Sequence, residues 1–166
     1  GRQVNPTVTA LQDKISLMEN GIATAAFATG MAAIGTTLFS LLRRGDHIIS
    51  SAFLFGNTNS LFNTFASHGI EVSFVDATDT ALVAAAIQPN TRLVFVETIA
   101  NPRTQVADLV GIGDLCEQHQ LIFCVDNTMT TPYLFQPRSV KASLVVNSLT
   151  KYIGGHGNAL GGAVTD

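Results

Sequence analysis

One lysine stands in a context that indicates chemistry rather than simple solvation. Lys151 lies in the stretch NSLTKYIGGH, residues 147–156, just after an apolar run. Ser148 and Thr150 place two hydroxyls one residue apart, so both can donate to one phosphate if they lie in a turn. A lysine amine becomes nucleophilic near neutral pH when it is desolvated or lies beside another cation. Taken alone, however, a lysine is more often a surface residue than a catalytic one.

Two other candidate site residues lie where predicted strands end. Asp126 ends the apolar run LIFCV, so we expect it to be at least partly buried and to need a cationic or donor partner. That partner is either a structural arginine or a capped helix, or the protonated ring nitrogen of a ligand. Gly30 follows a predicted strand and opens a predicted helix, whose free N–H groups suit a phosphate. Most turns of this kind are only turns.

Taken together, these residues describe a site for pyridoxal 5′-phosphate. Lys151 would meet the aldehyde, Asp126 the ring nitrogen, and the turn and hydroxyls the phosphate. The segment GGHGNALGG does not have the Gly-x-Gly-x-x-Gly spacing of a dinucleotide loop. The four histidines show no metal-ligand spacing, and we predict no metal site; they are His47, His68, His119 and His156.

Strand-like apolar runs alternate with amphipathic helical segments along the chain. Predicted strands cover residues 23–28, 47–50, 71–75, 92–97, 121–126 and 144–147, and another is in progress at 163–166. Predicted helices cover residues 6–20, 31–43, 58–68, 80–87 and 109–119. Short, continuously apolar strands separated by helices indicate an α/β fold with a mostly parallel sheet buried on both faces. Ligands of such sheets bind beyond the carboxyl ends of the strands.

Composition narrows the class of protein. The 166 residues are 46% hydrophobic and 13% charged, with a formal net charge of −3, which disfavours nucleic acid and anionic membrane surfaces as partners. No apolar run approaches the roughly 18–20 residues of a membrane span. Cys116 and Cys124 lie in apolar surroundings and are predicted to be reduced core thiols of a cytoplasmic protein. Because the chain opens without an initiator methionine, we expect it to be part of a longer protein.

The chain resembles the Cys/Met-metabolism family of pyridoxal-phosphate-dependent enzymes, of the O-acetylhomoserine sulfhydrylase and cystathionine γ-synthase type. The matching motifs occur in order along nearly the whole chain: NPT (5–7), TGMAAI (29–34), FGNT (55–58), ETIANP (97–102), VDNTMTTP (125–132) and NSLTKYIGGHG (147–157). The resemblance implies the large domain of the aspartate-aminotransferase-like fold, a three-layer, mainly parallel sheet with helices on both faces. Residues 1–166 would form this cofactor-binding domain, and a carboxyl-terminal small domain would lie outside them.

The resemblance also implies roles for individual residues. Lys151 would form the Schiff base with pyridoxal 5′-phosphate and move protons, and Asp126 would keep the pyridine nitrogen protonated. Backbone N–H groups of Gly30 and Met31 would bind the phosphate. The phosphate would receive further hydrogen bonds from the hydroxyls of Ser148 and Thr150.

Four more positions complete the implied site. Phe55 stands where most of the family has a tyrosine stacked on the ring, so the stacking is kept and the hydroxyl is lost. Asn101 would contact the 3-hydroxyl oxygen or the substrate, and Thr128 would lie near the ring. Arg2 would reach the phosphate of a neighbouring subunit. The implied assembly is therefore a homo-oligomer, a dimer of dimers with shared active sites.

The implied reaction is γ-replacement on an O-acylhomoserine with sulfide or a thiol, as in methionine and cysteine biosynthesis. One alternative is a lyase of the same family, which releases a thiol by β- or γ-elimination. Another is a catalytically inactive fragment or degenerate homologue that binds partners without cofactor. The intact set of Lys151, Asp126, Ser148 and Thr150 argues against degeneracy. Neither the acyl group nor the choice between replacement and elimination follows from these residues.

Overall fold

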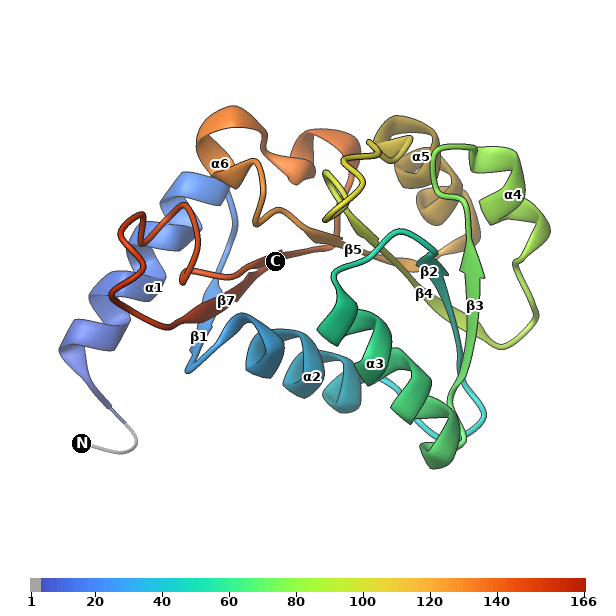
Figure 1. The fold of residues 1–166 in the computed structure, drawn as a ribbon, viewed down its shortest axis with the longest axis horizontal. Helices are drawn as coiled ribbons and strands as arrows, with labels where there is room; N and C mark the ends of the chain where they lie inside the picture. Colours follow the sequence, from blue (N-terminus) through green and yellow to red (C-terminus); the bar gives the residue numbers. More distant parts are fainter. Residues whose placement is uncertain (1–3) are drawn as a thin grey trace.

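The computed structural model describes residues 4–166, which form one seven-stranded sheet with helices on both faces (Figure 1). The strands are β1 (Thr24–Phe27), β2 (His47–Ser51), β3 (Glu71–Val75), β4 (Thr91–Glu97), β5 (Ile122–Asp126), β6 (Leu144–Asn147) and β7 (Gly162–Thr165). The α-helices are α1 (Pro6–Glu19), α2 (Gly30–Leu41), α3 (Gly56–Phe65), α4 (Thr80–Ala85), α5 (Leu109–His119) and α6 (Thr131–Leu134). Two short 3₁₀ helices are η1 (Ala66–His68) and η2 (Pro137–Val140). Arg2 lies outside the described residues.

The order of the strands explains how one edge of the sheet collects the ends of many strands. The order is β1-β7-β6-β5-β4-β2-β3, and the run from β6 to β3 is parallel throughout. β7 is antiparallel to both of its neighbours, β6 and β1. Two reversals restore the direction, so β1 runs the same way as the parallel strands. The carboxyl ends of β1, β2, β4, β5 and β6 therefore lie at the same edge.

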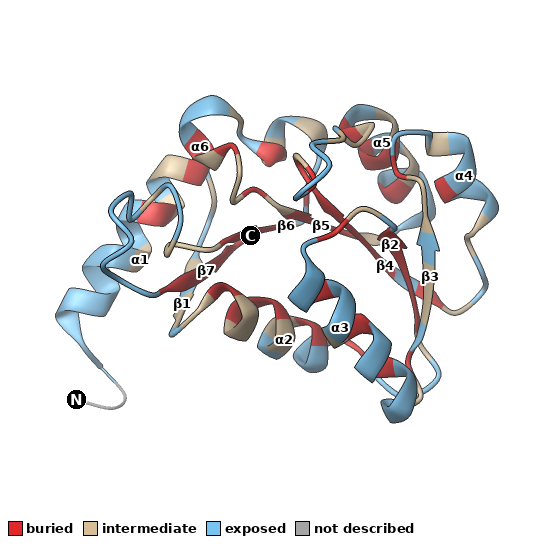
Figure 2. Cartoon of the chain, in the orientation of Figure 1, coloured by how far each residue is buried: buried red, intermediate tan, exposed pale blue. Residues whose placement is uncertain are grey.

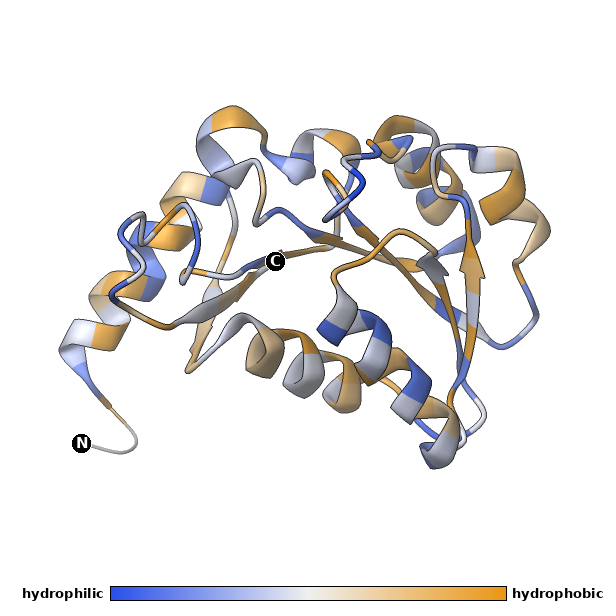
Figure 3. Cartoon of the chain, in the orientation of Figure 1, coloured by the Kyte–Doolittle hydropathy of each residue, from blue (hydrophilic) through white to orange (hydrophobic). Residues whose placement is uncertain are grey.

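The core divides into two layers because successive strand residues point to opposite faces of the sheet. In β4, Leu93 and Phe95 belong to the layer packed under α2 and α3. Val94 and Val96 belong to the layer packed under α4 and α5. Figure 2 shows the buried central strands between helices whose outer faces are exposed, while the edge strands β1 and β3 are less buried. Figure 3 shows the central strands as mainly hydrophobic. The predicted three-layer, mainly parallel α/β fold is confirmed.

Helix boundaries follow the capping chemistry of the sequence. Asn5 caps α1, since its side chain accepts from the N–H of Thr7 at 3.0 Å, and the helix ends where Asn20 adopts a left-handed conformation. All predicted strands and helices are present, with ends displaced by a few residues. The short helices α6 and η2 were not predicted because four residues carry too little periodic pattern. Among residues 4–166, no helix has the length and apolarity required to cross a membrane.

Candidate functional site

A cavity of about 640 Å³ opens beyond the carboxyl ends of the strands. Its wall is built from the segments that follow β1, β2, β4, β5 and β6. Every predicted site residue within the described part of the chain lines this cavity: Gly30, Met31, Phe55, Asn101, Asp126, Thr128, Ser148, Thr150 and Lys151. The sheet thus brings together residues that are up to 121 positions apart in the sequence, counting from Gly30 to Lys151.

The start of α2 forms one end of the cavity and presents free backbone N–H groups there. Thr29 caps the helix, because its hydroxyl accepts from the N–H of Ala32 at 3.0 Å. The N–H groups of Gly30 and Met31 have no hydrogen-bond acceptor within residues 4–166. A Cβ atom at position 30 would lie 2.7 Å from the Cβ of Ser148, so only glycine allows this close approach. Free N–H groups at a helix N-terminus, next to a serine hydroxyl, suit a phosphate.

Asp126, Thr128 and Ser148 are joined by a chain of hydrogen bonds. The N–H of Thr128 donates to Oδ1 of Asp126 at 3.0 Å, and the N–H of Ser148 donates to Oγ1 of Thr128 at 2.8 Å. Burial raises the pKa of Asp126, and the Thr128 hydrogen bonds lower it in part. These hydrogen bonds link Asp126, the carboxylate expected at the ring nitrogen, to Ser148, the serine expected at the phosphate. The relative positions of the two groups are therefore fixed by the protein.

Glu97 is a site residue that sequence reasoning missed. It is paired with Asp126 across the β4–β5 ladder and is 6% exposed. Its Oε1 accepts from the N–H of Phe55 at 2.7 Å, and its Oε2 accepts from the N–H of Asn101 at 3.2 Å. The carboxylate thus holds the two loops that present the predicted ring contacts. The signal that could have found Glu97 was its place at the end of the apolar run LVFV, which parallels that of Asp126.

The buried carboxyl group of Glu97 and the half-buried one of Asp126 are paired on neighbouring strands, and together they favour a positive charge nearby. Burial raises the pKa of Glu97 to about 7; the Phe55 N–H opposes this, and the negative charge of Asp126 adds to it. Neither Glu97 nor Asp126 forms an ion pair with any described residue of the chain. A cationic group bound in the cavity would relieve the repulsion. The protonated nitrogen of a pyridine ring is such a group, and the start of α2, whose free N–H groups suit a phosphate, lines the same cavity.

Lys151 lies in the loop between β6 and β7. Its side chain is exposed, lines the cavity, and makes no hydrogen bond or ion pair with any of residues 4–166. Thr150 also lines the cavity, but its hydroxyl is engaged with Gly161, donating to the carbonyl at 3.2 Å and accepting from the N–H at 3.1 Å. This contact closes the base of the loop. The role of Thr150 at a phosphate stays a prediction.

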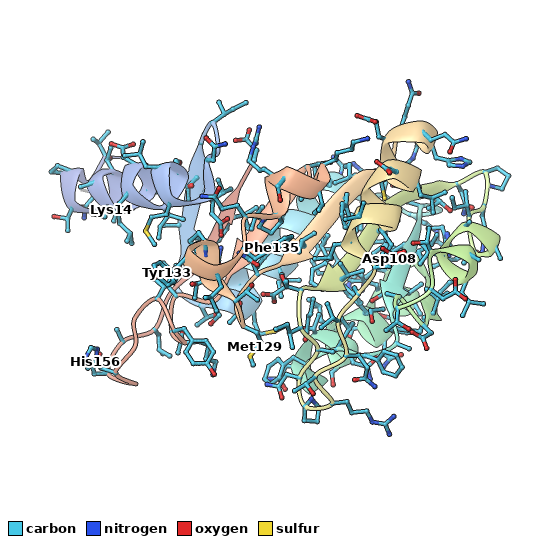
Figure 4. All side chains as sticks on the ribbon, turned by 90° about the horizontal axis from the view of Figure 1, so that it is seen from above. Lys14, Asp108, Met129, Tyr133, Phe135 and His156 are labelled. Atoms are coloured by element: carbon cyan, nitrogen blue, oxygen red, sulfur yellow. The ribbon has the colours of Figure 1, made fainter. Side chains whose placement is uncertain are left out.

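The turn after β5 and the β6–β7 loop border the cavity on one side. Figure 4 shows Met129 and Tyr133 on the chain that follows β5, and His156 at the tip of the neighbouring loop. Met129 lines the cavity, whereas the ring of His156 turns to the carbonyl of Gly154 in its own loop. Met129 and Tyr152 are further lining residues that were not predicted.

Comparison with known proteins agrees with this geometry. The family model described as "Cys/Met metabolism PLP-dependent enzyme" matches residues 1–166. The chain is 41% identical over 162 residues to an L-methionine γ-lyase of Fusobacterium nucleatum subsp. polymorphum, covering 96% of this chain and 41% of that protein. It is 42% identical over 164 residues to a cystathionine γ-synthase/O-acetylhomoserine (thiol)-lyase of Bacillus subtilis strain 168, covering 98% of this chain and 44% of the relative. The chain therefore spans about two fifths of the length of these curated relatives.

A solved structure shares the fold. A putative O-acetylhomoserine (thiol)-lyase of Campylobacter jejuni superposes with a TM-score of 0.94 at 34% identity, covering 98% of this chain and 40% of that one. That crystal structure contains N′-pyridoxyl-lysine-5′-monophosphate, a lysine joined to the cofactor. The neighbour's fold and its modified lysine agree with a cavity whose lining includes Lys151.

Proposed function

Because the chain belongs to the Cys/Met metabolism family of pyridoxal-phosphate-dependent enzymes, we propose that the protein carrying it catalyses γ-replacement on an O-acylhomoserine, with sulfide or a thiol as the incoming group. The observation that carries this proposal is the meeting of Lys151, Asp126 and the free N–H groups of Gly30 and Met31 around one cavity. When bound, pyridoxal phosphate supplies an aldehyde that condenses with amino groups and a ring that accepts electron density.

Residues at the ends of helices and strands would bind and orient the cofactor. The N–H groups of Gly30 and Met31, with the Ser148 hydroxyl, would hold the phosphate at the start of α2. Asp126, at the end of β5, would hold a proton on the ring nitrogen, and its charge would then be paired rather than isolated. The ring of Phe55 lies at the cavity wall, where its backbone is fixed by Glu97.

Lys151 is the group assigned to proton transfer. Its side chain lines the cavity and forms no ion pair with any described residue, so the amine is free to reach a substrate. In γ-replacement a base must take protons from the α and β carbons before the acyl group leaves the γ carbon. The same base then returns protons after sulfide or a thiol adds at the γ carbon.

Elimination is the second candidate, and it is favoured by the relatives described as methionine γ-lyases. The binding residues would be shared by the two reactions, which differ in whether an incoming thiol adds or a thiol is released. The loaded enzyme would be assayed with acyl-homoserine plus sulfide and, separately, with methionine or cystathionine alone. If only the first assay yields product, the result supports replacement. If only the second assay releases a thiol and an oxo acid, the protein belongs with the lyases.

Covalent labelling tests the site itself. The protein is incubated with pyridoxal phosphate, reduced with borohydride, digested and analysed by mass spectrometry. We expect label on Lys151 alone, and none without cofactor. Lys14 on the exposed side of α1 and Lys141, which is ion-paired to Asp114 and Glu117, serve as internal controls. Label spread evenly over all three lysines would contradict a specific site.

A homo-oligomer with shared sites is part of the proposal. Large apolar side chains are exposed on α1, on α6 and on the segments after α1 and before β7: Leu17, Ile22, Tyr133, Leu134 and Leu160. Such a group of side chains supports a covered surface in the assembled protein. We expect Arg2→Ala to weaken cofactor binding without changing the assembly size in gel filtration with light scattering. Unchanged cofactor affinity in a confirmed dimer would exclude Arg2 from the neighbour's site.

A further inference from the structure

A fully buried carboxyl group lies behind the site, at the end of α1. Glu19 is the last residue of that helix and has 0% exposure. Its Oε1 accepts from Nδ2 of Asn147 at 2.5 Å and from Nδ2 of Asn127 at 3.4 Å. These partners are 128 and 108 residues away in the sequence. Neither asparagine is exposed, so the three side chains form a polar cluster inside the molecule.

The surroundings of Glu19 disfavour a negative charge. Within residues 4–166, no lysine, arginine or histidine forms an ion pair with Glu19. The residue also ends a helix, where the helix dipole is negative and repels a carboxylate. Burial raises the pKa of Glu19, and the hydrogen bonds from Asn147 and Asn127 oppose this only in part.

Two oxygen atoms of the cluster lack a hydrogen-bond donor among the described residues. Oε2 of Glu19 and Oδ1 of Asn147 are both buried, and neither has a hydrogen-bond partner among the described residues. These two oxygens belong to the two groups already joined through Oε1 and Nδ2. Two acceptors cannot satisfy each other, but a proton on Oε2 turns the carboxyl into a donor for the amide oxygen. A proton on Oε2 would give both orphaned atoms a partner and would complete a two-bond acid–amide pair.

The cluster lies directly behind two residues of the site. Asn127 follows Asp126 in the chain, and Asn147 precedes Ser148. The N–H of Asn127 donates to the carbonyl of Val146 at 2.8 Å, which joins the ends of β5 and β6. Its side-chain oxygen accepts from the hydroxyls of Thr98 and Thr130, and its Nδ2 donates to the carbonyl of Phe135.

We propose that Glu19 is a positioning residue, a neutral carboxylic acid that donates from Oε2 to Oδ1 of Asn147 and so fixes the ends of β5 and β6 that carry Asp126 and Ser148. The proton that the acid keeps remains in the pair and takes no part in the reaction. The inference rests on the cofactor site and is independent of whether the reaction is replacement or elimination.

Three variants of the holoenzyme separate a neutral Glu19 from an ionised one. Glu19→Gln keeps the cofactor dissociation constant within about twofold, because an amide also donates to Oδ1 and accepts from Nδ2 of Asn147. Glu19→Ala raises that constant at least about tenfold, because buried polar atoms of Asn147 and Asn127 lose their partner. Glu71→Gln makes the same chemical change at an exposed position of β3 and is the matched control.

Infrared spectroscopy reads the protonation state directly and does not depend on the folding of the alanine variant. The difference between wild-type and Glu19→Gln proteins at neutral pH shows loss of a carboxylic-acid carbonyl band, whereas the Glu71→Gln difference shows loss of a carboxylate band. Loss of a carboxylate band at Glu19 would overturn the proposal. So would a Glu19→Gln protein whose cofactor affinity falls as far as that of Glu19→Ala. Because the infrared measurement needs no activity, its outcome is separate from that of the function assays.

Discussion

Replacing Glu97 by glutamine gives a quantitative test of how the cavity is built. Glu97 is 6% exposed, its carboxyl group accepts from the N–H groups of Phe55 and Asn101, and it is paired with Asp126 across the β4–β5 ladder. Glutamine keeps the size of the side chain but offers one acceptor oxygen instead of two. The variant therefore loses one of the two backbone hydrogen bonds at every pH. Because glutamine does not ionise, the stability of the variant has no contribution from titration at position 97. The difference between wild type and variant therefore reports the titration of Glu97.

The expected pH dependence follows from the raised pKa. Folding moves the pKa of Glu97 from 4.5 to about 7, so between these values the folded protein binds a proton that the unfolded chain has lost. The resulting stabilisation is fully present below pH 4.5 and is lost as the pH rises through 7. The shift corresponds to about 3 kcal/mol of free energy of unfolding. Wild type should thus lose about 3 kcal/mol relative to Glu97→Gln between pH 4 and pH 8.

The assay is urea unfolding of the cofactor-free proteins across this pH range. Groups that do not interact with Glu97, such as His47, are common to both proteins and cancel in the difference, whereas Asp126 is coupled to Glu97 and contributes to it. Glu117→Gln makes the same chemical change at an exposed position of α5, where it removes one carboxylate partner of Lys141, and is the matched control. A difference between wild type and Glu97→Gln that stays flat from pH 4 to pH 8 would refute the argument. A difference that favours wild type as the pH rises would mean that the pKa is lowered instead.

Three further substitutions test separate parts of the site. Gly30→Ala should lower stability or cofactor affinity by about 1–3 kcal/mol, because the new Cβ meets Ser148 at 2.7 Å. Gly56→Ala is the control, because its new Cβ faces open space and should leave both quantities unchanged. Urea unfolding measures stability, and cofactor titration measures affinity. Asp126→Asn should weaken cofactor binding by about 1.5–3 kcal/mol through loss of a charged partner for the ring nitrogen; an unchanged dissociation constant in an absorbance titration would remove Asp126 from the ring. Phe55→Tyr should leave the free energy of unfolding within about 0.5 kcal/mol of wild type, because residue 55 is 40% exposed. A larger change in the unfolding midpoint would mean that the ring edge is tightly packed.

Local sequence patterns were sufficient to predict the helices and strands and to single out candidate site residues inside recognisable motifs. The apolar runs that end at Glu97 and Asp126 predict buried strands because burial on both faces excludes polar side chains from the strand interior. Asn5-Pro6 and Thr29-Gly30 predict helix starts through capping chemistry. The described site residues named from motifs all line one cavity, because parallel strands deliver their carboxyl ends to one edge.

The long-range polar contacts could not be predicted in this way. Glu19 reads in sequence as an ordinary charged residue near a helix end, yet it is buried against Asn147, 128 positions later. Likewise, the sequence gives no sign that the Thr150 hydroxyl binds Gly161 rather than remaining free. Hydrogen bonds of this kind depend on the register and packing of distant elements, and periodicity contains no information about either.

The sequence by itself determined the α/β class and the strands and helices, and it singled out Lys151 and Asp126 as candidate site residues, because these follow from side-chain type and from spacing along the chain. Only the tertiary structure decided that β7 inserts antiparallel between β6 and β1, so that the turn at Gly30 faces Ser148. It also decided that Glu97 lies beside Asp126 and that Glu19 lies behind both strand ends. The physical reason is that burial and charge interactions depend on which groups meet in space, and only the folded chain establishes that.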